Sequence, residues 1–329
     1  MSRDSSPWDP TNLPDLEGRT YLVTGGNAGI GFFASEQLAG AGAHVILSGR
    51  NPNRLQRARA AIERRVPGAS VESLLLDTSN LGSVRAAAAT VRTRKKLDGL
   101  LLNAGIVHPP RTRDENREGN ELVLATNALG HWALAGELLL PLAAARGRIV
   151  WLGSISTSMW RYDPVDAQLR ERYSPWRAYV QSKVVAMALG FEAHRRLVEA
   201  SIPVGSVVAH PGFSVSGRTA VVRGVNEPSR RTQLVDGLQA AVTQSKERGA
   251  WAPVRALIDP DVHSGDYIGP RRTLRGEPVH VRAAAYTRSI ELGSRVWELA
   301  ESATRYEWPL KRGTRPRWAD RGWLRGRGR

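Results

Sequence analysis

Short apolar runs alternate with longer helical patterns over the first two thirds of this chain. Apolar runs bounded by turn residues are typical of buried strands, and longer amphipathic segments are typical of helices. The predicted strands are residues 21–23, 44–47, 73–76, 99–102, 148–152 and 204–209, and the predicted helices are residues 30–39, 53–65, 80–94, 120–140 and 176–200. Strands joined through helices require crossovers that cover both faces of a parallel sheet. The pattern predicts a single doubly wound α/β (Rossmann) domain with a mostly parallel sheet of about seven strands, six of them in these ranges.

The last third of the chain is less regular. It contains predicted helices near residues 233–247, at 251–258 and within 287–304. Residues 217–233 are polar with glycine and proline, which makes them the candidate for a mobile substrate lid.

The formal net charge of +16 is unevenly distributed. Residues 311–329 contribute +7 of it, and the remaining charge is spread thinly over 310 residues. Of the 47 basic residues, 42 are arginines, and in the main part of the chain they do not cluster. Solvated surface charge is therefore favoured over a nucleic-acid-binding surface. Association of the tail with nucleic acid or an anionic membrane is the alternative.

The chain contains no cysteine, which excludes disulfides, thiolate metal sites and cysteine nucleophiles. The seven histidines never stand at metal-ligand spacing, so no metal site is predicted. Met1–Pro10 lacks the apolar segment of a secretory signal, and the longest apolar stretch, Ala133–Ala145, is too short to span a bilayer. We therefore expect a cytoplasmic protein without a transmembrane segment.

A glycine-rich loop, TGGNAGIG at residues 24–31, joins the first predicted strand to the first predicted helix. Its glycines would let the backbone turn tightly and approach a pyrophosphate, which the positive end of the following helix would attract. The strand before the loop, the helix after it and the second strand favour dinucleotide binding over a structural turn. The candidate cofactor contacts in this loop are Gly25, Asn27, Gly29, Ile30 and Gly31.

Further motifs follow this glycine loop along the chain. They are Asn103-Ala104-Gly105, Asn127 in TNALGHW, Ser154, Tyr179 and Lys183 in YVQSK, and His210-Pro211-Gly212. From residue 24 to 212 the ordered set resembles the short-chain dehydrogenase/reductase superfamily. The resemblance implies an oxidoreductase that transfers a hydride between NAD(P)(H) and a carbonyl or alcohol substrate.

The resemblance implies a catalytic set of Asn127, Ser154, Tyr179 and Lys183. A tyrosine and a lysine at positions i and i+4 lie one helical turn apart, and a nearby ammonium is expected to lower the phenol pKa from ~10 toward neutrality. Tyr179 would then be the acid/base, Lys183 would hold the nicotinamide ribose, Ser154 would bind the substrate oxygen, and Asn127 would hold a water. Ser156 is an alternative to Ser154.

The resemblance also implies cofactor contacts outside the glycine loop. Those near the nicotinamide are Pro211 and Gly212, with Ser216 where relatives have a threonine that binds the carboxamide. Asp77 resembles the residue that contacts adenine, although it could instead cap the following helix. The other predicted contacts are Asn103, Ala104, Gly105, Tyr179 and Lys183.

The end of the second predicted strand favours NADP(H) over NAD(H). NAD-selective relatives carry an acidic residue there that binds the ribose hydroxyls, whereas this chain has Gly49 followed by Arg50. A guanidinium can pair with a 2′-phosphate, and Ser48 could add a hydroxyl donor. Alternatively, Arg50 is one more surface arginine.

The segment between Ser154 and Tyr179 is long and contains Trp160, Tyr162, Tyr173 and Trp176. Its length resembles the retinol-dehydrogenase-like and protochlorophyllide-reductase-like branch, which implies a bulky, largely apolar carbonyl or alcohol. The aromatic residues could equally pack within the loop or at an oligomer contact. GDYIGP, residues 265–270, looks like the seventh strand that closes the far edge of the sheet in this family.

We therefore divide the chain into an N-terminal extension (1–17), the main domain (18–305) and a basic tail (306–329) expected to be disordered. Within the domain, residues 18–150 form the cofactor half and 151–305 the catalytic and substrate part. A catalytically silent NADP(H)-binding sensor is the alternative function, which the complete Asn-Ser-Tyr-Lys set disfavours. Related folds are commonly dimers or tetramers, and no nucleic-acid partner is expected.

Overall fold

The computed structural model describes residues 8–159 and 162–310. Trp160 and the predicted disorder beyond residue 310 lie outside the described residues. Eight strands form the central sheet in the order β10-β9-β6-β5-β4-β1-β2-β3, and all neighbours are parallel except β9 and β10. The strands are β1 (Thr20–Thr24), β2 (His44–Gly49), β3 (Ser70–Leu75), β4 (Gly99–Leu102), β5 (Arg148–Leu152), β6 (Gly205–Ala209), β9 (Tyr267–Pro270) and β10 (Pro278–His280). The predicted doubly wound fold is confirmed.

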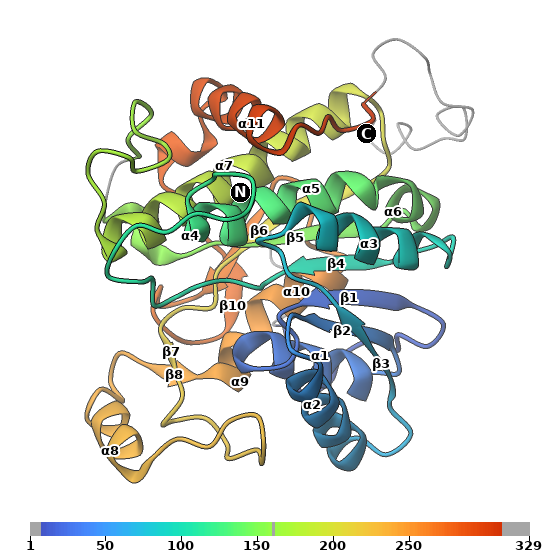
Figure 1. Cartoon of the computed structure of the whole chain (residues 1–329). Helices are drawn as coiled ribbons and strands as arrows, with labels where there is room; N and C mark the ends of the chain where they lie inside the picture. The colour runs from blue at the N-terminus through green and yellow to red at the C-terminus, as the bar shows by residue number, and fades with distance from the viewer. Residues whose placement is uncertain (1–7, 160–161, 311–329) are drawn as a thin grey trace, which may run out of the picture.

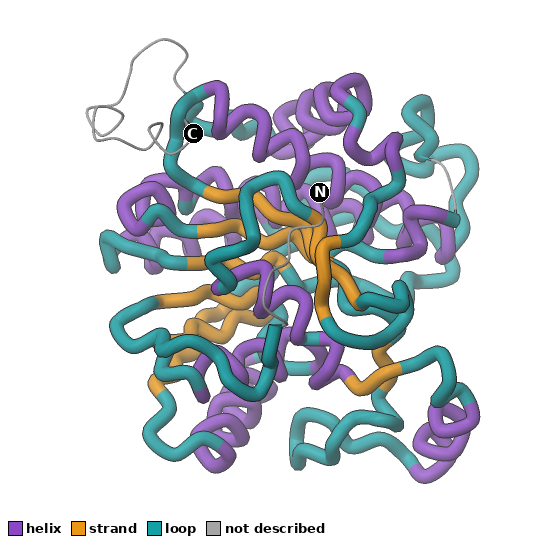
Figure 2. The backbone as a smooth tube through the Cα atoms, turned by 180° about the vertical axis from the view of Figure 1, so that it is seen from behind, coloured by secondary structure: helices purple, strands orange, loops and turns teal. Residues whose placement is uncertain are grey.

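Helices cover both faces of this sheet (Figure 1). One face carries α3 (Leu81–Arg92), α4 (Leu122–Leu124), α5 (Gly130–Glu137), α6 (Leu139–Ala145) and α7 (Pro175–Glu199), with α11 (Ile290–Thr304) outside α7. The other face carries α1 (Gly29–Gly40), α2 (Pro52–Arg65) and α10 (Trp251–Ile258). A separate pair of short strands, β7 (Ser214–Val215) and β8 (Gln244–Ser245), lies beside α8 (Arg230–Leu238) and α9 (Lys246–Gly249), away from the main sheet (Figure 2).

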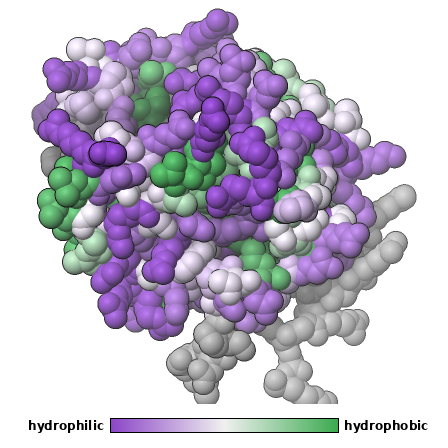
Figure 3. Space-filling model, turned by 90° about the horizontal axis from the view of Figure 1, so that it is seen from below, coloured by the Kyte–Doolittle hydropathy of each residue, from purple (hydrophilic) through white to green (hydrophobic). Residues whose placement is uncertain are grey.

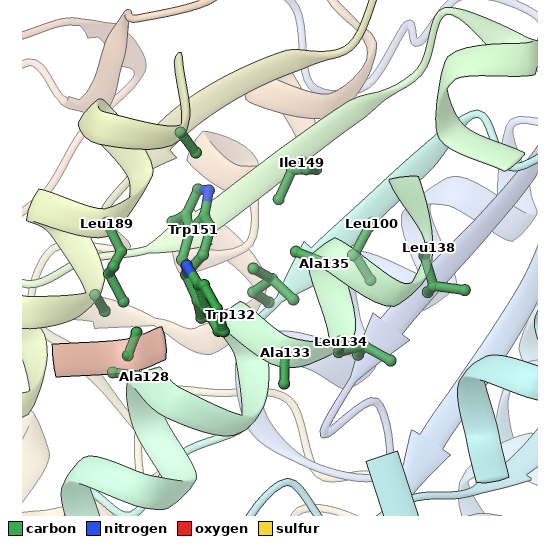
Figure 4. Packing of buried hydrophobic residues seen from close by; sticks show 14 of the residues in the cluster. Leu100, Ala128, Trp132, Ala133, Leu134, Ala135, Leu138, Ile149, Trp151 and Leu189 are labelled. Carbon is green, nitrogen blue, oxygen red and sulfur yellow. The ribbon is translucent and has the colours of Figure 1, made fainter. Parts of the chain in front are cut away.

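Two apolar cores lie on the two faces of the sheet. In the larger core, Trp132 of α5 and Trp151 of β5 lie among aliphatic side chains (Figure 4). Trp132 makes edge-to-face contacts with Trp297 and Tyr306 at centroid distances of 5.5 and 5.8 Å, and its carbonyl accepts a hydrogen bond from Trp308 Nε1. The boundary predicted at residue 305 is therefore too early, because the aromatic residues after it belong to the core.

The helix predicted over residues 120–140 is interrupted twice. Residues Ala125–Leu129 form a π-helix between α4 and α5, and the chain bends by 61° between α5 and α6. Pro141 explains the bend, because proline has no N–H and its ring would clash with the carbonyl four residues earlier. That carbonyl, of Glu137, accepts from Arg92 instead.

Two further expectations are corrected at the periphery. The helix predicted near residues 233–247 ends at Leu238, because Gln244 N donates to Phe213 O and draws the following residues into the β7–β8 pair. The strand in GDYIGP exists as β9, but it does not close the sheet, since β10 pairs antiparallel with its outer edge.

Among the described residues, no single helix is long and apolar enough to cross a membrane, and only the bent segment from α4 to α6 passes that test as a pair. The described residues also contain no group of three His, Asp or Glu side chains placed to hold a metal ion. The expected cytoplasmic location stays a prediction.

Candidate active site

The glycine loop between β1 and α1 packs against the turn after β4. A Cβ on Gly31 would lie 2.4 Å from Asn103 Nδ2, and one on Gly25 would lie 2.9 Å from Ala104 Cα. Gly25 and Gly29 also have positive φ angles of 67° and 58°, which side chains other than glycine rarely adopt. The loop therefore requires its glycines for close packing and for its turn.

The first turn of α1 is available to an anion. Among the described residues, no side chain caps α1 and no acidic residue occupies its first turn, whereas Asn51, Asn80 and Ser174 cap α2, α3 and α7. Uncapped amide groups at a helix N-terminus carry partial positive charge. The loop thus presents amide donors where a pyrophosphate would need them.

Lys246, at the start of α9, faces this loop. Its Cδ lies 3.9 Å from the position that a Cβ on Gly29 would take, and its ammonium donates to Ser216 Oγ. Burial lowers the pKa of Lys246, and the nearby Asp236 carboxylate acts in the opposite direction. A cation and a helix N-terminus that face each other fit a bound pyrophosphate well, since both favour negative charge between them.

Sequence reasoning missed Lys246 because no local motif marks it and it is distant from the loop in the chain. The one signal in the sequence was the residue type, because Lys246 is a lysine in a chain whose basic residues are mostly arginine.

The end of β2 leaves little room for a side chain at residue 49. A Cβ on Gly49 would lie 2.5 Å from Asn27 Oδ1. Arg50 is exposed at the strand end, and Asn51 caps α2. Ser48 is fully buried and its hydroxyl donates to Val23 O, so it is not available as the suggested donor to a 2′-phosphate.

The turn after β4 is held by hydrogen bonds to β1. Asn103 Nδ2 donates to Thr24 O at 2.8 Å, and the backbone N–H groups of Asn103 and Ala104 donate to Thr24 Oγ1. A Cβ on Gly105 would lie 2.9 Å from Asn127 Oδ1. Asn103, Ala104 and Gly105, predicted as cofactor contacts, thus connect the turn after β4 to Thr24 and Asn127 at the base of the site.

Asp77 does not cap the helix that follows it. Its Oδ1 accepts from the backbone and the hydroxyl of Ser79, while Asn80 caps α3 through Ser83 N. The alternative that Asp77 is a helix cap is therefore wrong.

Three residues of the predicted catalytic set meet at the end of β5. The Tyr179 hydroxyl donates to Ser154 Oγ at 3.4 Å, and Lys183 Nζ donates to Leu152 O at 2.8 Å. Ser156 donates to Ser154 Oγ through its backbone and its hydroxyl. Ser154, and not its alternative Ser156, therefore contacts Tyr179, and Ser156 contacts Ser154.

The pKa of Tyr179 is raised, because its burial outweighs the opposing hydrogen bond with Ser154. Burial also lowers the pKa of Lys183 to about 8. The expectation that the lysine lowers the phenol pKa is wrong for this structure, since the Lys183 ammonium donates to the Leu152 carbonyl and not to the phenol. Tyr179 is therefore protonated at neutral pH.

Asn127 lies in the π-helix, a feature that often marks functional sites. Its amide accepts from Ile106 N at 2.7 Å and donates to Ser182 Oγ at 2.9 Å. The side chain thus links the turn after β4 to α7, one residue before Lys183.

The carbonyl of Asn127 contacts the buried His131, which the sequence analysis did not single out. His131 Nδ1 lies 3.2 Å from Asn127 O, and Nε2 lies 2.9 Å from Thr24 Oγ1. Because Thr24 Oγ1 already accepts from Asn103 N and Ala104 N, we assign Nε2 as the acceptor and Nδ1 as the donor to Asn127 O. Burial, reinforced by the Lys183 charge, lowers the pKa of His131 to about 3 and keeps it neutral.

Gly212, after β6, rests on the hairpin that joins β9 to β10. It has a φ of 65°, and a Cβ on it would lie 2.3 Å from Leu274 O. Phe213 N donates to the same carbonyl, and Gln244 Nε2 donates to Pro211 O. The hairpin and β8 therefore fix the segment predicted to lie beside the nicotinamide.

Residues 216–243, which include the lid predicted at 217–233 and are here called the lid segment, connect β7 to β8. Asn226 Nδ2 donates to Thr219 O and Ala220 O, and Val222 is buried. A Cβ on Gly224 would lie 3.1 Å from Arg57 Cδ on α2. The lid segment thus reaches from the Gly212 side of the site to α2.

The predicted aromatic residues do not all face one pocket. Tyr173 donates to Pro110 O, and Tyr162 packs against the larger core. Trp176 is 47% exposed, and its ring centroid lies 6.4 Å from that of Tyr179. Loop packing therefore explains Tyr162 and Tyr173, and Trp176 is placed beside the site.

Known proteins with similar sequences and folds agree with this architecture. A family pattern described as short chain dehydrogenase matches residues 19–163. The polyprenol dehydrogenase of Mus musculus is 33% identical in an alignment of 297 residues that covers 88% of this chain and 84% of that protein. Retinol dehydrogenase 14 of the same organism is 30% identical, with 77% and 78% of the two chains covered. The crystal structure of an uncharacterised protein from Mycobacterium paratuberculosis is 29% identical, with a TM-score of 0.75 over 93% of this chain and 100% of that chain.

The chain therefore belongs to the short-chain dehydrogenase/reductase family. Within it, the relatives place the protein in the retinol-dehydrogenase-like branch. It is an oxidoreductase that acts on the CH–OH/C=O group of a small-molecule substrate with a nicotinamide dinucleotide. The alternative of a silent binding module is not supported.

Proposed function

We propose that this enzyme transfers a hydride between NADP(H) and a bulky, apolar alcohol or carbonyl, with Tyr179 as the acid/base. The observation that carries the proposal is the contact of the Tyr179 hydroxyl with Ser154 Oγ, at 3.4 Å, beside the buried Lys183. The bound nicotinamide supplies or accepts the hydride. Every other step belongs to residues of this chain.

In carbonyl reduction, Ser154 donates a hydrogen bond to the substrate oxygen while Tyr179 transfers its proton to that oxygen. The phenol carries the proton that this step needs at neutral pH, since burial raises its pKa. In alcohol oxidation, Tyr179 first releases its own proton to solvent, and the phenolate then takes the proton of the substrate hydroxyl. Asn127 and His131 would hold the surrounding backbone in place.

NADP(H) is favoured by the end of β2. Gly49 replaces the expected acid, the Asn27 side chain occupies the adjacent space, and Arg50 is exposed at the end of the strand, where it would pair with a 2′-phosphate. Lys246 and the first turn of α1 would hold the pyrophosphate, which is common to NAD and NADP. Asp77 would contact the adenine, and Pro211 and Gly212 the nicotinamide.

A bulky apolar substrate is supported by exposed side chains that flank the site in sequence. Met159 follows the Ser154 turn, Trp176 precedes Tyr179, and Phe213 follows Gly212; they are 69%, 47% and 42% exposed. The face that includes α8 shows separate apolar patches among hydrophilic residues (Figure 3). Since similar proteins are named for polyprenol and retinol, we propose a long-chain isoprenoid alcohol or aldehyde.

The test uses the full chain with NADP⁺ and a polyprenol, retinol or a short alcohol. We expect turnover with the long substrates, and Tyr179→Phe should reduce kcat by at least ~100-fold while leaving NADPH binding within about twofold. Tyr173→Phe is the matched control, since that hydroxyl donates to Pro110 O. Unchanged turnover in Tyr179→Phe would refute the assignment.

A further inference from the structure

A cavity of about 760 Å³ opens beside the proposed active site. Its walls come from the β9–β10 hairpin, the two ends of the lid segment and the α9–α10 junction. Among the described lining residues are none of the glycine loop and none of the Ser154–Tyr179–Lys183 cluster. We call it the arginine cavity, after Arg218, Arg248, Arg271, Arg272 and Arg275 in its walls.

The arginine cavity carries an excess of positive charge. Five arginines line it, and Glu277 is the one carboxylate among its described lining residues. Glu277 lies 3.5 Å from Arg271, and both side chains are about 60% exposed, so solvent weakens this pair. A concave site with several guanidinium groups and one carboxylate favours anions. Planar guanidinium groups are particularly suited to phosphate oxygens.

The walls of the cavity are held in place from several sides. Arg218 donates to Ala240 O and to Thr243 O, and the Arg248 guanidinium lies over the Trp251 ring at 5.3 Å. The buried Gln244 accepts from Gly276 N at 3.0 Å, which ties the hairpin to β8. These contacts thus hold Arg218 and Arg248, and the turn that carries the other three arginines is tied to β8.

The hairpin and β8 also contact the proposed nicotinamide segment. Leu274 O, in the hairpin, accepts from Phe213 N, and Gln244 donates to Pro211 O. Arg218 and Thr243 lie at the two ends of the lid segment. A ligand that bridges the hairpin and these ends would therefore hold the lid segment against the site.

We propose that the arginine cavity binds a phosphate ester or diphosphate, separately from the dinucleotide. A volume of about 760 Å³ accommodates more than one phosphate group, since pockets of ~300–1,000 Å³ hold drug-sized ligands. Trp251 offers an aromatic surface for the rest of the ligand. The phosphate could belong to a soluble metabolite or to a lipid headgroup, and the experiment separates these sources.

The test measures pyrophosphate binding by calorimetry with the full chain saturated with NADP⁺ or NAD⁺, so that the glycine loop is occupied. We expect one pyrophosphate per chain and an affinity loss of at least ~10-fold in Arg271→Ala/Arg272→Ala/Arg275→Ala. Arg64→Ala/Arg85→Ala/Arg117→Ala removes the same charge from exposed arginines elsewhere and should bind as the wild type does. Equal losses in both variants, or no binding in the wild type, would overturn the proposal.

Two further arms complete the experiment. Phosphatidylcholine vesicles with phosphatidic acid identify a lipid headgroup if they bind the wild type and the control variant but not the cavity variant. Pyrophosphate binding without such vesicle binding identifies a soluble phosphate ester. If the alanine variant fails to fold, the triple Arg→Lys variant keeps the charge and should bind more weakly through loss of the planar fork.

This proposal does not require the chemistry assigned to Tyr179. Tyr179→Phe should bind pyrophosphate like the wild type, so a failure of the proposed function leaves this test intact.

Discussion

The region around Tyr179 and the lid segment differ in how their side chains are held. Ser154, Asn127 and Lys183 are buried and bonded to backbone at the ends of strands. The lid segment carries α8, which has no buried residue among those described, and exposes Leu234 and Leu238. Packed interiors hold side chains in one arrangement, whereas exposed segments can adapt. We therefore propose that the chemistry rests on the buried region around Tyr179 and the choice of substrate on the exposed lid segment.

The largest expected effect lies in the buried region around Tyr179. Ser154→Ala should reduce kcat by ~100-fold, because it removes a donor to the developing charge on the substrate oxygen. Ser156→Ala, the matched control two residues away, should reduce kcat by no more than about threefold. Steady-state kinetics with a saturating cofactor measure both. Equal losses would show that the two hydroxyls act as one unit.

The buried His131 should make the buried region around Tyr179 sensitive to acid. Its folded-state pKa of about 3 lies below its ordinary value of 6.5. Its contribution to stability is therefore present above pH ~6.5 and is lost as pH falls toward the folded pKa. Between pH 7 and pH 5 the free energy of unfolding should fall by ~2 kcal/mol more in the wild type than in His131→Gln. Urea unfolding at the two pH values measures the difference, and identical pH dependence would contradict it.

Substitutions of Lys246 and Arg50 should distinguish binding of the pyrophosphate from binding of the 2′-phosphate. Lys246→Ala should raise the Kd of NADPH and of NADH alike by ~10-fold, since the pyrophosphate is common to both. Arg50→Ala should raise the Kd of NADPH by a similar factor and leave NADH unchanged, because only NADPH carries the 2′-phosphate. Fluorescence titration distinguishes the two patterns, with Lys96→Ala, an exposed lysine elsewhere, as the control. An equal effect of Arg50→Ala on both cofactors would refute the NADP assignment.

The smallest expected effect is in the lid segment. Leu234→Ser/Leu238→Ser should change the free energy of unfolding by less than ~0.5 kcal/mol, because both side chains are exposed. It should raise KM for a long-chain alcohol by about threefold and leave KM for a short alcohol unchanged. If both values of KM stay the same, the lid segment does not select the substrate.

Much of the fold could be predicted from local patterns. The strands at 99–102 and 148–152 have the predicted bounds, because short apolar runs between turns are read directly from the chain. The helix predicted over 120–140 differs in the structure, which has a π-helix at Ala125–Leu129 and a bend between α5 and α6 before Pro141. A Cβ on Gly130 would lie 1.8 Å from Thr78 O, so the segment after the π-helix packs directly on the loop that follows β3.

Part of the candidate site could be predicted as well. Tyr179 and Lys183 are four residues apart on one helix, so their proximity could be predicted. Ser154 follows a parallel strand, and ligand sites in this fold lie at the carboxyl ends of such strands. His131 and Lys246 were missed, since each faces the glycine loop only after the sheet has formed and the chain has returned to it.

The sequence by itself determined the order of strands and helices and the identity of the glycine, serine, tyrosine and lysine motifs, because these depend on near neighbours. Tertiary structure alone decided that burial outweighs the Ser154 hydrogen bond in setting the pKa of Tyr179, that Lys246 faces α1, and that the arginine cavity forms. Burial and the proximity of charges depend on groups that are far apart in the chain. Their effect on pKa and binding exists only once the folded chain brings them together.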